Sequence, residues 1–563
     1  MKEEIAKLVA EEVKLKKEQI FAMLEVPPSL DMGDFALPCF KLSSSLKKNP
    51  VEIANMLAKS IKPRKGLERV EVKGGYLNFF VDKNSEIKDF FESLDKDFGK
   101  SKEGKGKKIV VDFSGPNVGK PMHVGHIRST IIGDSLIRVY NFLGYETIGI
   151  NYLGDIGLHI GKLIVGWELW LDKKALKEDP VKELLRLYVK FCEKEKSEFQ
   201  EGEDIAEDYS NNEWTIKAKE KLKLIELGDK KTSEIWKEIR DASGKGFDRV
   251  YQLLKVNFTE TTGQSNFSDA GKELILGAVK KGIAKAEQSG AVYFEFDKLP
   301  KKYVLRSNGT ASYMTQDIGA CVYRAKKYKF DKMIYVTDYR QKLHFEQLFE
   351  IAKKLGYDFS AKCFHVPFGT VNFGKEIIAT RAGKVVLLED VLKKTIEKAG
   401  EEIKKRKTKG DPEKVGVAAV KYIILRNEPV KDVEFSWDVA LNFEGDTGPY
   451  IQYSYARASS IVKKSKAKKI NLIIPKKFDN SELELAKKLE DFPEVVKSVA
   501  EKLNPQLLAN YAFQLAQIFN EFYHSCIVIG SESESFRLKL VEAFKIVLKN
   551  ALYLLGIEVM KEM

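Results

Sequence analysis

One β-loop-α-β pattern, at residues 109–153, constrains the fold more than any other stretch of the chain. Residues 109–113 (IVVDF) are β-branched and mostly apolar, which is typical of a buried parallel strand. A glycine-containing turn follows, Pro121 is suited to the first position of a helix, and apolar residues then recur on one helical face as far as Gly144. The segment YETIGINYL resumes a strand. Such a unit predicts a Rossmann-type parallel sheet that binds nucleotide at its carboxyl edge.

The rest of the chain divides around this unit. Residues 1–100 form a separate α+β pattern, which ends in the glycine- and lysine-rich stretch KSKEGKGKK. Residues 101–390 carry the parallel sheet, interrupted at about 161–248 by an insertion of Lys- and Glu-rich helices. The strand–helix alternation then returns at KMIYVTD, KLHFEQLFEIAKKLG and AKCFHVPFGTV. The residue pattern predicts a helical connection at 391–440 and an all-α domain at 441–563.

Composition narrows the class of protein. The net charge of +13 favours a polyanionic partner, although an excess of solvated lysines explains it equally well. The five cysteines lie far apart with no CxxC pair, which suits a reducing compartment and argues against a zinc ribbon. No apolar run is long enough to span a membrane, and the amino terminus lacks the apolar centre of a signal peptide. We therefore expect a cytoplasmic protein.

The turn SGPNVGKPMHVGHIRST holds two of the six histidines in the chain. A metal site is disfavoured because no HExxH pattern or third ligand accompanies His123 and His126. A P-loop is disfavoured because the glycine spacing is one residue short and Pro121 replaces the expected Ser or Thr. The remaining interpretation is an anion cradle at a helix amino terminus, where Gly125 admits a nucleotide and Lys120 and both imidazoles contact phosphate. A tight turn with buried histidines is the alternative.

The HxGH pattern resembles the HIGH signature of class I aminoacyl-tRNA synthetases. Its surroundings, DFSGPNVGKPMHVGHIRSTIIGDSL, are similar to the arginyl-tRNA synthetase family. Further similar segments are MGDFALPCFKL, NYLGDIGLHIGKL, SYMTQDIGACVYR, GDTGPYIQYSYARASSI and VLKNALYLLGIEVMKEM. The resemblance implies an ATP-dependent arginine–tRNA ligase that forms arginyl-adenylate and then arginylates tRNA(Arg). It also implies an amino-terminal domain at the tRNA elbow and a carboxyl-terminal anticodon-binding domain.

The resemblance also implies roles for individual residues. His123, His126 and Lys120 would stabilise phosphate charge on ATP, which binds together with Mg²⁺, and no structural metal is expected. The family's mobile lysine loop corresponds to IATRAG, where Thr380 and Arg381 would contact ATP; Lys120 would supply its missing second lysine. The residues expected to bind arginine are Asp112, Asn117, Tyr313, Asp317 and Gln341. Those expected around the adenosine are Gly125, His344, Val366, Phe368 and Gly369.

Two details qualify the arginine pocket. Many relatives carry the longer Glu where this chain has Asp112, so its reach to the guanidinium differs. His159 stands where relatives often have Gln. Tyr313 and Asp317 are four residues apart, so a helix over 315–325 places both on one face.

Aromatic and basic side chains mark candidate tRNA contacts. Those of the carboxyl-terminal region are Tyr450, Tyr453, Arg457, Asn520 and Tyr523. Tyr455, Tyr511 and Phe519 share the pattern, and we expect at least one or two of these aromatics to be core residues instead. In the amino-terminal domain, Tyr76 and Asn78 have the period-2 spacing of one strand face and would hold a flipped-out loop base.

Three alternatives remain beside an arginine ligase acting as a monomer. A ligase for another amino acid would not need the pair Asp112 and Asp317. A nucleotidylyltransferase would not need some 120 helical residues at the carboxyl end. A non-catalytic RNA-binding relative would not need the intact Lys120, His123 and His126.

Overall fold

A computed structural model describes residues 1–27, 29, 32–197, 212–373, 387–465 and 470–563. Their contacts divide them into two compact units. The first comprises Met1–Phe98, Ala467–Glu490 and Cys526–Ala543, and the second comprises Gly99–Lys466, Asp491–Ser525 and Phe544–Met563. Among the described helices, none combines the length and apolar character needed to cross a membrane.

The first unit contains the predicted α+β module. Its antiparallel sheet has the order β1-β3-β2. The strands are β1 (Phe35–Pro38), β2 (Leu67–Lys73) and β3 (Tyr76–Val81), and the helices are α1 (Lys2–Val13), α2 (Lys17–Met23), α3 (Ser43–Leu46), α4 (Pro50–Ser60), α5 (Lys83–Ser93) and α20 (Asn480–Glu490). Helix α4 begins at a strong start signal: the Asn49 side chain accepts from the Val51 N–H, and Pro50 takes the first helical position.

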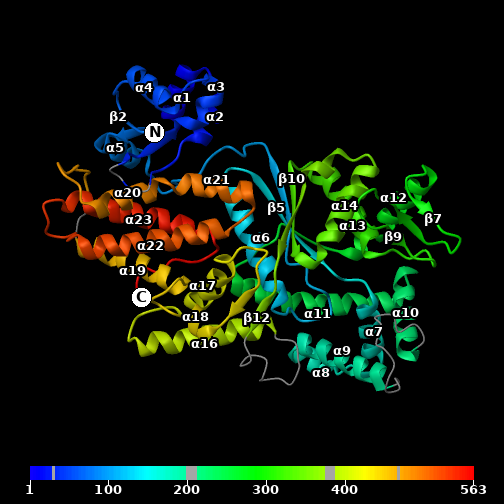
Figure 1. Ribbon diagram of the computed structural model, residues 1–563. Helices are drawn as coiled ribbons and strands as arrows, with labels where there is room; N and C mark the ends of the chain where they lie inside the picture. The colour runs from blue at the N-terminus through cyan, green and yellow to red at the C-terminus, as the bar shows by residue number, and fades with distance from the viewer. Residues whose placement is uncertain (28, 30–31, 198–211, 374–386, 466–469) are drawn as a thin grey trace. The chain divides into compact units, whose positions relative to one another are not determined.

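The second unit is built on a five-stranded parallel sheet of order β11-β10-β4-β5-β6, which confirms the Rossmann-type prediction. The strands are β4 (Lys108–Asp112), β5 (Glu146–Leu153), β6 (Glu260–Gly263), β10 (Lys332–Asp338) and β11 (Cys363–Phe368). Helices α13 (Tyr313–Tyr328) and α14 (Lys342–Lys354) cover one face, and α6 (Gly125–Phe142) covers the other (Figure 1). Gly133 lets α6 approach closely, because a Cβ there would stand 2.2 Å from Cγ of Phe113.

The start of α6 corrects the sequence prediction. The helix begins at Gly125, four residues after Pro121. The reason is a tertiary contact: His123 forms an isolated antiparallel bridge with Leu387, and the Leu388 N–H donates to the Met122 carbonyl at 2.9 Å. The backbone at 122–123 is therefore held outside helical geometry. At the other end Gly144, with φ +84°, follows the helix as expected.

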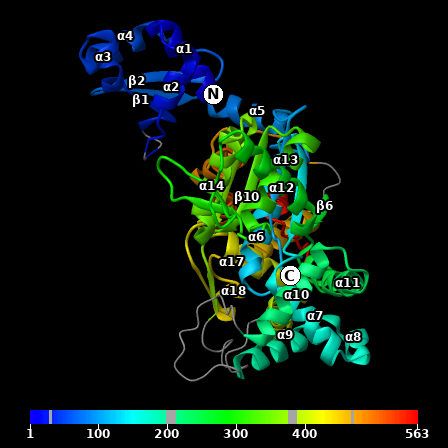
Figure 2. The same ribbon diagram turned by 90° about the vertical axis from the view of Figure 1, so that its right-hand side faces the viewer.

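A helical insertion and a small sheet branch from the parallel sheet. The insertion helices form a group of their own in Figure 2. They are α7 (Leu158–Trp170), α8 (Lys173–Glu178), α9 (Pro180–Ser197), α10 (Glu213–Glu226) and α11 (Lys230–Leu254). Helix α12 (Ser268–Lys280) then leads to an antiparallel sheet that the sequence did not reveal, made of β7 (Lys285–Ala286), β8 (Val292–Phe294) and β9 (Lys302–Leu305).

The carboxyl-terminal part is helical, as predicted, with one short pairing of β12 (Val371–Phe373) and β13 (Val433–Phe435). The helices are α16 (Leu388–Lys405), α17 (Pro412–Leu425), α18 (Trp437–Ala440), α19 (Gly448–Lys464), α21 (Phe492–Lys502), α22 (Gln506–Ser525) and α23 (Glu534–Leu554). Residues 481–503, which read as one amphipathic run, form two helices instead. They are α20 and α21, and the break falls at Asp491.

Candidate functional site

The signature turn lies at the carboxyl edge of the parallel sheet, directly after β4. Ser114 and Gly115 have positive φ values of 73° and 58°, and the Ser114 N–H donates to Oγ of Ser129 on α6 at 2.8 Å. The turn also pairs with the segment after β5, because Asn117 bridges to Gly154 and the Val118 N–H donates to the Gly154 carbonyl. These contacts fix the loop where open α/β sheets bind ligands.

The rings of the two signature histidines contact each other, with centroids 4.0 Å apart and planes tilted by 42°. The Gly125 N–H donates to Nδ1 of His123 at 3.0 Å, and the His123 N–H donates to Nδ1 of His126 at 3.2 Å. The neutral ring of His123 therefore carries its proton on Nε2, as a hydrogen-bond donor, whereas Nδ1 of His126 is 3.2 Å from both the backbone nitrogen and the carbonyl oxygen of His123. Burial, with the charge of His123, lowers the pKa of His126 to about 3. Burial and then Lys120 also lower the pKa of His123.

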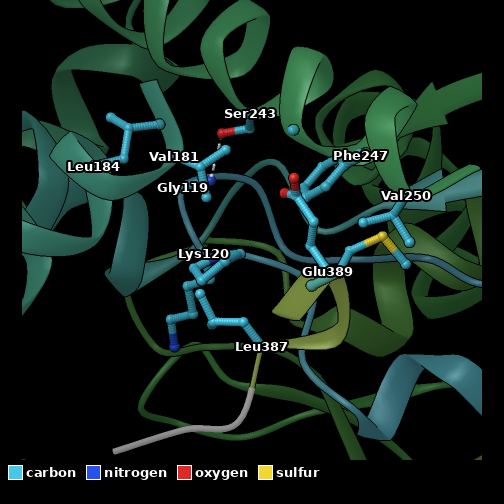
Figure 3. Close-up of a pocket in the computed structure, with 12 residues that line it drawn as sticks. Gly119, Lys120, Val181, Leu184, Ser243, Phe247, Val250, Leu387 and Glu389 are labelled. Carbon is cyan, nitrogen blue, oxygen red and sulfur yellow. Dashed lines mark hydrogen bonds between the residues drawn. The ribbon is translucent and has the colours of Figure 1, made fainter. Parts of the chain in front are cut away.

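Lys120 lies beside these histidines and packs on the helical insertion. Its Nζ stands 4.6 Å from the ring centroid of Tyr188 on α9, and burial lowers its pKa. Lys120 also borders a small cavity of about 30 Å³ between the turn, α9 and α11 (Figure 3). His159 belongs to the same group: its Nε2 is 3.2 Å from the Gly154 carbonyl, and burial, then Lys120, lower its pKa to about 4. The structure therefore gathers three imidazoles and an ammonium group around the predicted phosphate site.

The predicted arginine-binding residues differ in exposure to solvent. Asn117, Tyr313 and Gln341 are exposed, whereas Asp317 is partly buried and Asp112 is buried. Tyr313 and Asn117 are exposed at the edge of the site, and the Tyr313 hydroxyl lies near Gly157, where an added Cβ would be 3.2 Å from it. Asp317 sits on α13 with its side chain 17% exposed, and its Oδ2 is 2.6 Å from Nε2 of His344. Gln341 is exposed at the end of the short helix η4 (Tyr339–Gln341).

Asp112 departs from its expected environment. Its Oδ2 accepts a 2.6 Å hydrogen bond from Nη1 of Arg324, and the exposed fractions of the two side chains are 10% and 2%. Burial raises the pKa of Asp112, and Arg324 acts in the opposite direction. The expected bracket of two free carboxylates around a guanidinium is thus altered, because one carboxylate already holds a guanidinium of the chain itself. Sequence analysis missed Arg324, although its position seven residues after Asp317 places both on one helical face.

The predicted adenosine residues lie on and just after β11. Val366 and Phe368 are buried, so their side chains belong to the core and their backbone is what a ligand could reach. Gly369 packs against residues 430–432, and its N–H donates to the Pro429 carbonyl. His344 contacts Asp317 rather than this strand end. Thr380 and Arg381 lie outside the described residues.

The strand end holds one further histidine that sequence analysis did not assign. His365 on β11 stacks on Phe345 with centroids 4.7 Å apart, and its Nε2 is 2.9 Å from Oγ1 of Thr337. Burial lowers its pKa to about 4. Its place beside the sheet's carboxyl edge was not visible in the sequence, because it needs the parallel pairing of Thr337 and Pro367 on β10 and β11.

The predicted carboxyl-terminal tRNA contacts come together. Nη1 of Arg457 donates to Oδ1 of Asn520 at 2.5 Å, and Nδ2 of Asn520 donates to the Tyr450 hydroxyl at 2.8 Å. The Arg457 guanidinium also lies 4.9 Å from the Tyr453 ring centroid and 5.3 Å from that of Tyr523. Four of these five residues line one cavity of about 540 Å³, together with Arg406, Thr408, Phe443, Glu444, His524 and Met563.

Other aromatics of this region are core residues, as anticipated. Tyr455, Tyr511 and Phe519 are all buried. In the first unit, Tyr76 is 40% exposed and meets Phe40 edge-on with centroids 5.9 Å apart. Asn78 is only 5% exposed, so in this structure its amide is turned into the module rather than toward a ligand.

Comparison with known proteins identifies the family. Residues 92–437 match "tRNA synthetases class I (R), catalytic domain", residues 451–563 match "DALR anticodon binding domain", and residues 1–81 match "Arginyl tRNA synthetase N terminal domain". The chain is 40% identical to an arginine–tRNA ligase of Clostridium perfringens, covering 99% of each chain. It is 38% identical to that of Clostridium acetobutylicum, covering 100% of each.

Solved structures agree on the fold. The arginyl-tRNA synthetase of Thermus thermophilus superposes with a TM-score of 0.81 at 23% identity, covering 100% of both chains. The Plasmodium falciparum enzyme gives 0.78 at 24% identity, covering 100% of this chain and 98% of the other. With its HxGH turn, parallel sheet and carboxyl-terminal helices, the chain belongs to the arginyl-tRNA synthetase family of class I aminoacyl-tRNA synthetases.

Proposed function

We propose that this arginine–tRNA ligase works in two steps at the carboxyl edge of its parallel sheet. The arginine carboxylate first attacks the α-phosphorus of ATP, releasing pyrophosphate and forming arginyl-adenylate. The terminal adenosine hydroxyl of tRNA(Arg) then attacks the activated carbonyl and releases AMP. The observation that carries this proposal is the grouping of Lys120, His123, His126 and His159 beside the helix α6 amino terminus.

Phosphate stabilisation is the main catalytic contribution of this group. A carboxylate is already a nucleophile, so the first step needs positioning and charge stabilisation rather than a general base. In the free protein the histidines are neutral, and the Nε2 proton of His123 serves as a donor to phosphate oxygens, with the ring of His126 beside it. Lys120 adds a cation after leaving the Tyr188 ring, and Thr380 and Arg381 also contact ATP.

The nucleotide arrives as ATP with Mg²⁺. Residues 114–130 contain no carboxylate, so the ion travels on the phosphates rather than on ligands from the signature turn. The adenosine lies between Gly125 and the backbone of residues 366–369. His344 contributes through Asp317, with which it shares a hydrogen bond.

Arginine is recognised by its charge and its planar donors. Asp317 pairs with the guanidinium, and Tyr313 and Gln341 line the approach. Asn117 holds the α-amino or carboxylate end. Asp112 completes the wall of the pocket through its pair with Arg324.

The tRNA contacts lie on two parts of the chain. The cavity lined by Tyr450, Tyr453, Arg457 and Asn520 suits an unstacked anticodon base, because aromatic faces and a guanidinium lie side by side. In the amino-terminal module, exposed Tyr76 offers a stacking face to a base at the tRNA elbow.

The domain limits proposed for this function are 1–100, 101–390, 391–440 and 441–563. The three family matches support the limits near residues 100 and 440, because one match ends at 81, the next spans 92–437 and the third begins at 451. No match begins or ends near residue 391. We propose that the enzyme acts as a cytoplasmic monomer.

The experiment that tests the proposal is arginylation of tRNA(Arg) by the full chain and by a His123→Asn/His126→Asn variant. The full chain should charge the tRNA with arginine. The variant should lose at least about 100-fold in kcat, because two donors aimed at developing charge are removed. Charging at an undiminished rate by the variant would contradict the assigned roles.

A further inference from the structure

A buried arginine of the chain lies in the wall of the amino acid pocket. Arg324 is on α13, two turns after Asp317, and its Nη1 donates to Oδ2 of Asp112 at the end of β4. Its guanidinium centre stands 4.7 Å from the ring centroid of Tyr152 and 5.8 Å from that of Tyr335. The Arg324 cation is therefore fixed between two aromatic rings beside Asp112, whose carboxyl lies within electrostatic range of Asp317.

The cluster is not built as an optimal structural ion pair. Only one hydrogen bond joins Arg324 to Asp112, and Nη2 of Arg324 has no hydrogen-bond partner among the described residues. The hydroxyls of Tyr152 and Tyr335 also lack partners within the described chain. Each unpaired buried group costs about 1–3 kcal/mol, and a buried ion pair contributes little net stability. Because these unpaired buried groups lower the stability of the fold and lie at the ligand-binding edge of the sheet, they point to a role in the site.

Counting charges shows what that role is. Asp112 and Arg324 pair with each other, so Asp317 is the wall carboxylate that has no lysine or arginine partner among the described residues and shares a hydrogen bond with His344 instead. One guanidinium then neutralises the pocket. Without Arg324 the pocket would carry two negative charges, and without Asp112 it would already be neutral before the substrate entered.

We propose that Arg324 is a positioning residue that balances the charge of Asp112, so that Asp317 alone provides the net negative charge for the substrate guanidinium. The inference deepens the proposed function and rests on its assignment of arginine recognition to this pocket. Asp112 then acts through Arg324 and not as a direct guanidinium ligand. The effect of Asp112 on substrate binding therefore depends on Arg324, the cation that it neutralises.

A double-mutant cycle tests the proposal by ATP–pyrophosphate exchange of the full chain with tRNA(Arg), measuring the KM for arginine and for ATP. Asp112→Asn leaves a permanent buried cation, which repels the substrate and should raise the arginine KM about 100-fold. Arg324→Met should raise it less, because the buried carboxyl of Asp112 can take up a proton. Asp112→Asn/Arg324→Met should return the arginine KM to within about fivefold of the unmodified protein.

Two further variants separate charge from structure. Arg324→Lys keeps the cation and should hold the arginine KM within about fivefold. Lys327→Met, which removes from the same helix a half-exposed lysine that pairs with Glu260 of β6, should leave the arginine KM unchanged. The ATP KM should stay constant throughout, and Tm should report any loss of folding.

Three outcomes would overturn the inference. They are a double variant as impaired as Asp112→Asn, a parallel rise of the ATP KM, and an Arg324→Lys variant as impaired as Arg324→Met. Failure of the unmodified protein to exchange with arginine would refute the proposed function instead.

Discussion

Replacing Asp317 by Asn removes a pocket carboxylate that has no lysine or arginine partner among the described residues. The side chain is 17% exposed, so the site is neither bulk water nor dry interior. At about 4 Å and an effective dielectric constant of about 20, the attraction to a guanidinium is about 4 kcal/mol. Desolvation offsets part of this, which leaves about 2–3 kcal/mol for a charge-assisted hydrogen bond. The arginine KM should therefore rise by about 30- to 150-fold.

The assay is ATP–pyrophosphate exchange in the presence of tRNA(Arg), with arginine and ATP varied separately. Asn keeps the shape of the side chain and can still meet His344, so the change isolates the charge. The matched control is Glu260→Gln, which removes a carboxylate of similar exposure, 19%, that pairs with α13 through Lys327. A rise of less than about fivefold in the arginine KM, or an equal rise in the ATP KM, would refute the reasoning.

Three other predictions concern stability and tRNA. The pKa of His126 is lowered to about 3 in the folded chain, whereas its ordinary value is 6.5. The contribution of neutral His126 to the free energy of unfolding is therefore fully present above about pH 6.5 and is lost as the pH falls below that value. His126→Gln should recover about 2 kcal/mol of unfolding free energy at pH 5 relative to pH 7, measured by denaturant titration at both pH values. Arg457→Met should raise the tRNA KM about tenfold or more with unchanged arginine and ATP KM in aminoacylation kinetics. Tyr76→Ala should raise the tRNA KM with little change in Tm, whereas Asn78→Ala, at a buried position, should lower Tm.

Local pattern predicted most of the elements because their causes are local. The strand KMIYVTD is β10 without a residue of difference, and the helix over 315–325 is part of α13. The parallel sheet followed from one strand–turn–helix unit and the return of the same alternation some 200 residues later. The start of α6 was wrong because its cause is not local: Leu387 and Leu388 hold the backbone of 122–123 in an extended form.

In the candidate site, too, features with a local cause were predicted from the sequence, and features that depend on distant residues were not. Histidine spacing indicated that His123 and His126 act together, and the structure brings their ring centroids to within 4.0 Å of each other. The partner of Asp112 could not be read from the sequence, since Arg324 is 212 residues away. The burial of Asn78 could not be predicted from the sequence either. Period-2 spacing places Tyr76 and Asn78 on one strand face, but it does not say which part of that face the module covers.

The most direct test of the account is ATP–pyrophosphate exchange with each of the common amino acids, with and without tRNA(Arg). The Asp317 carboxylate, set beside a phosphate-binding group of histidines in a chain of the arginyl-tRNA synthetase family, predicts exchange with arginine and with no other amino acid. The family resemblance further predicts that this exchange requires tRNA(Arg). Exchange with lysine, or no exchange under any condition, would contradict the account.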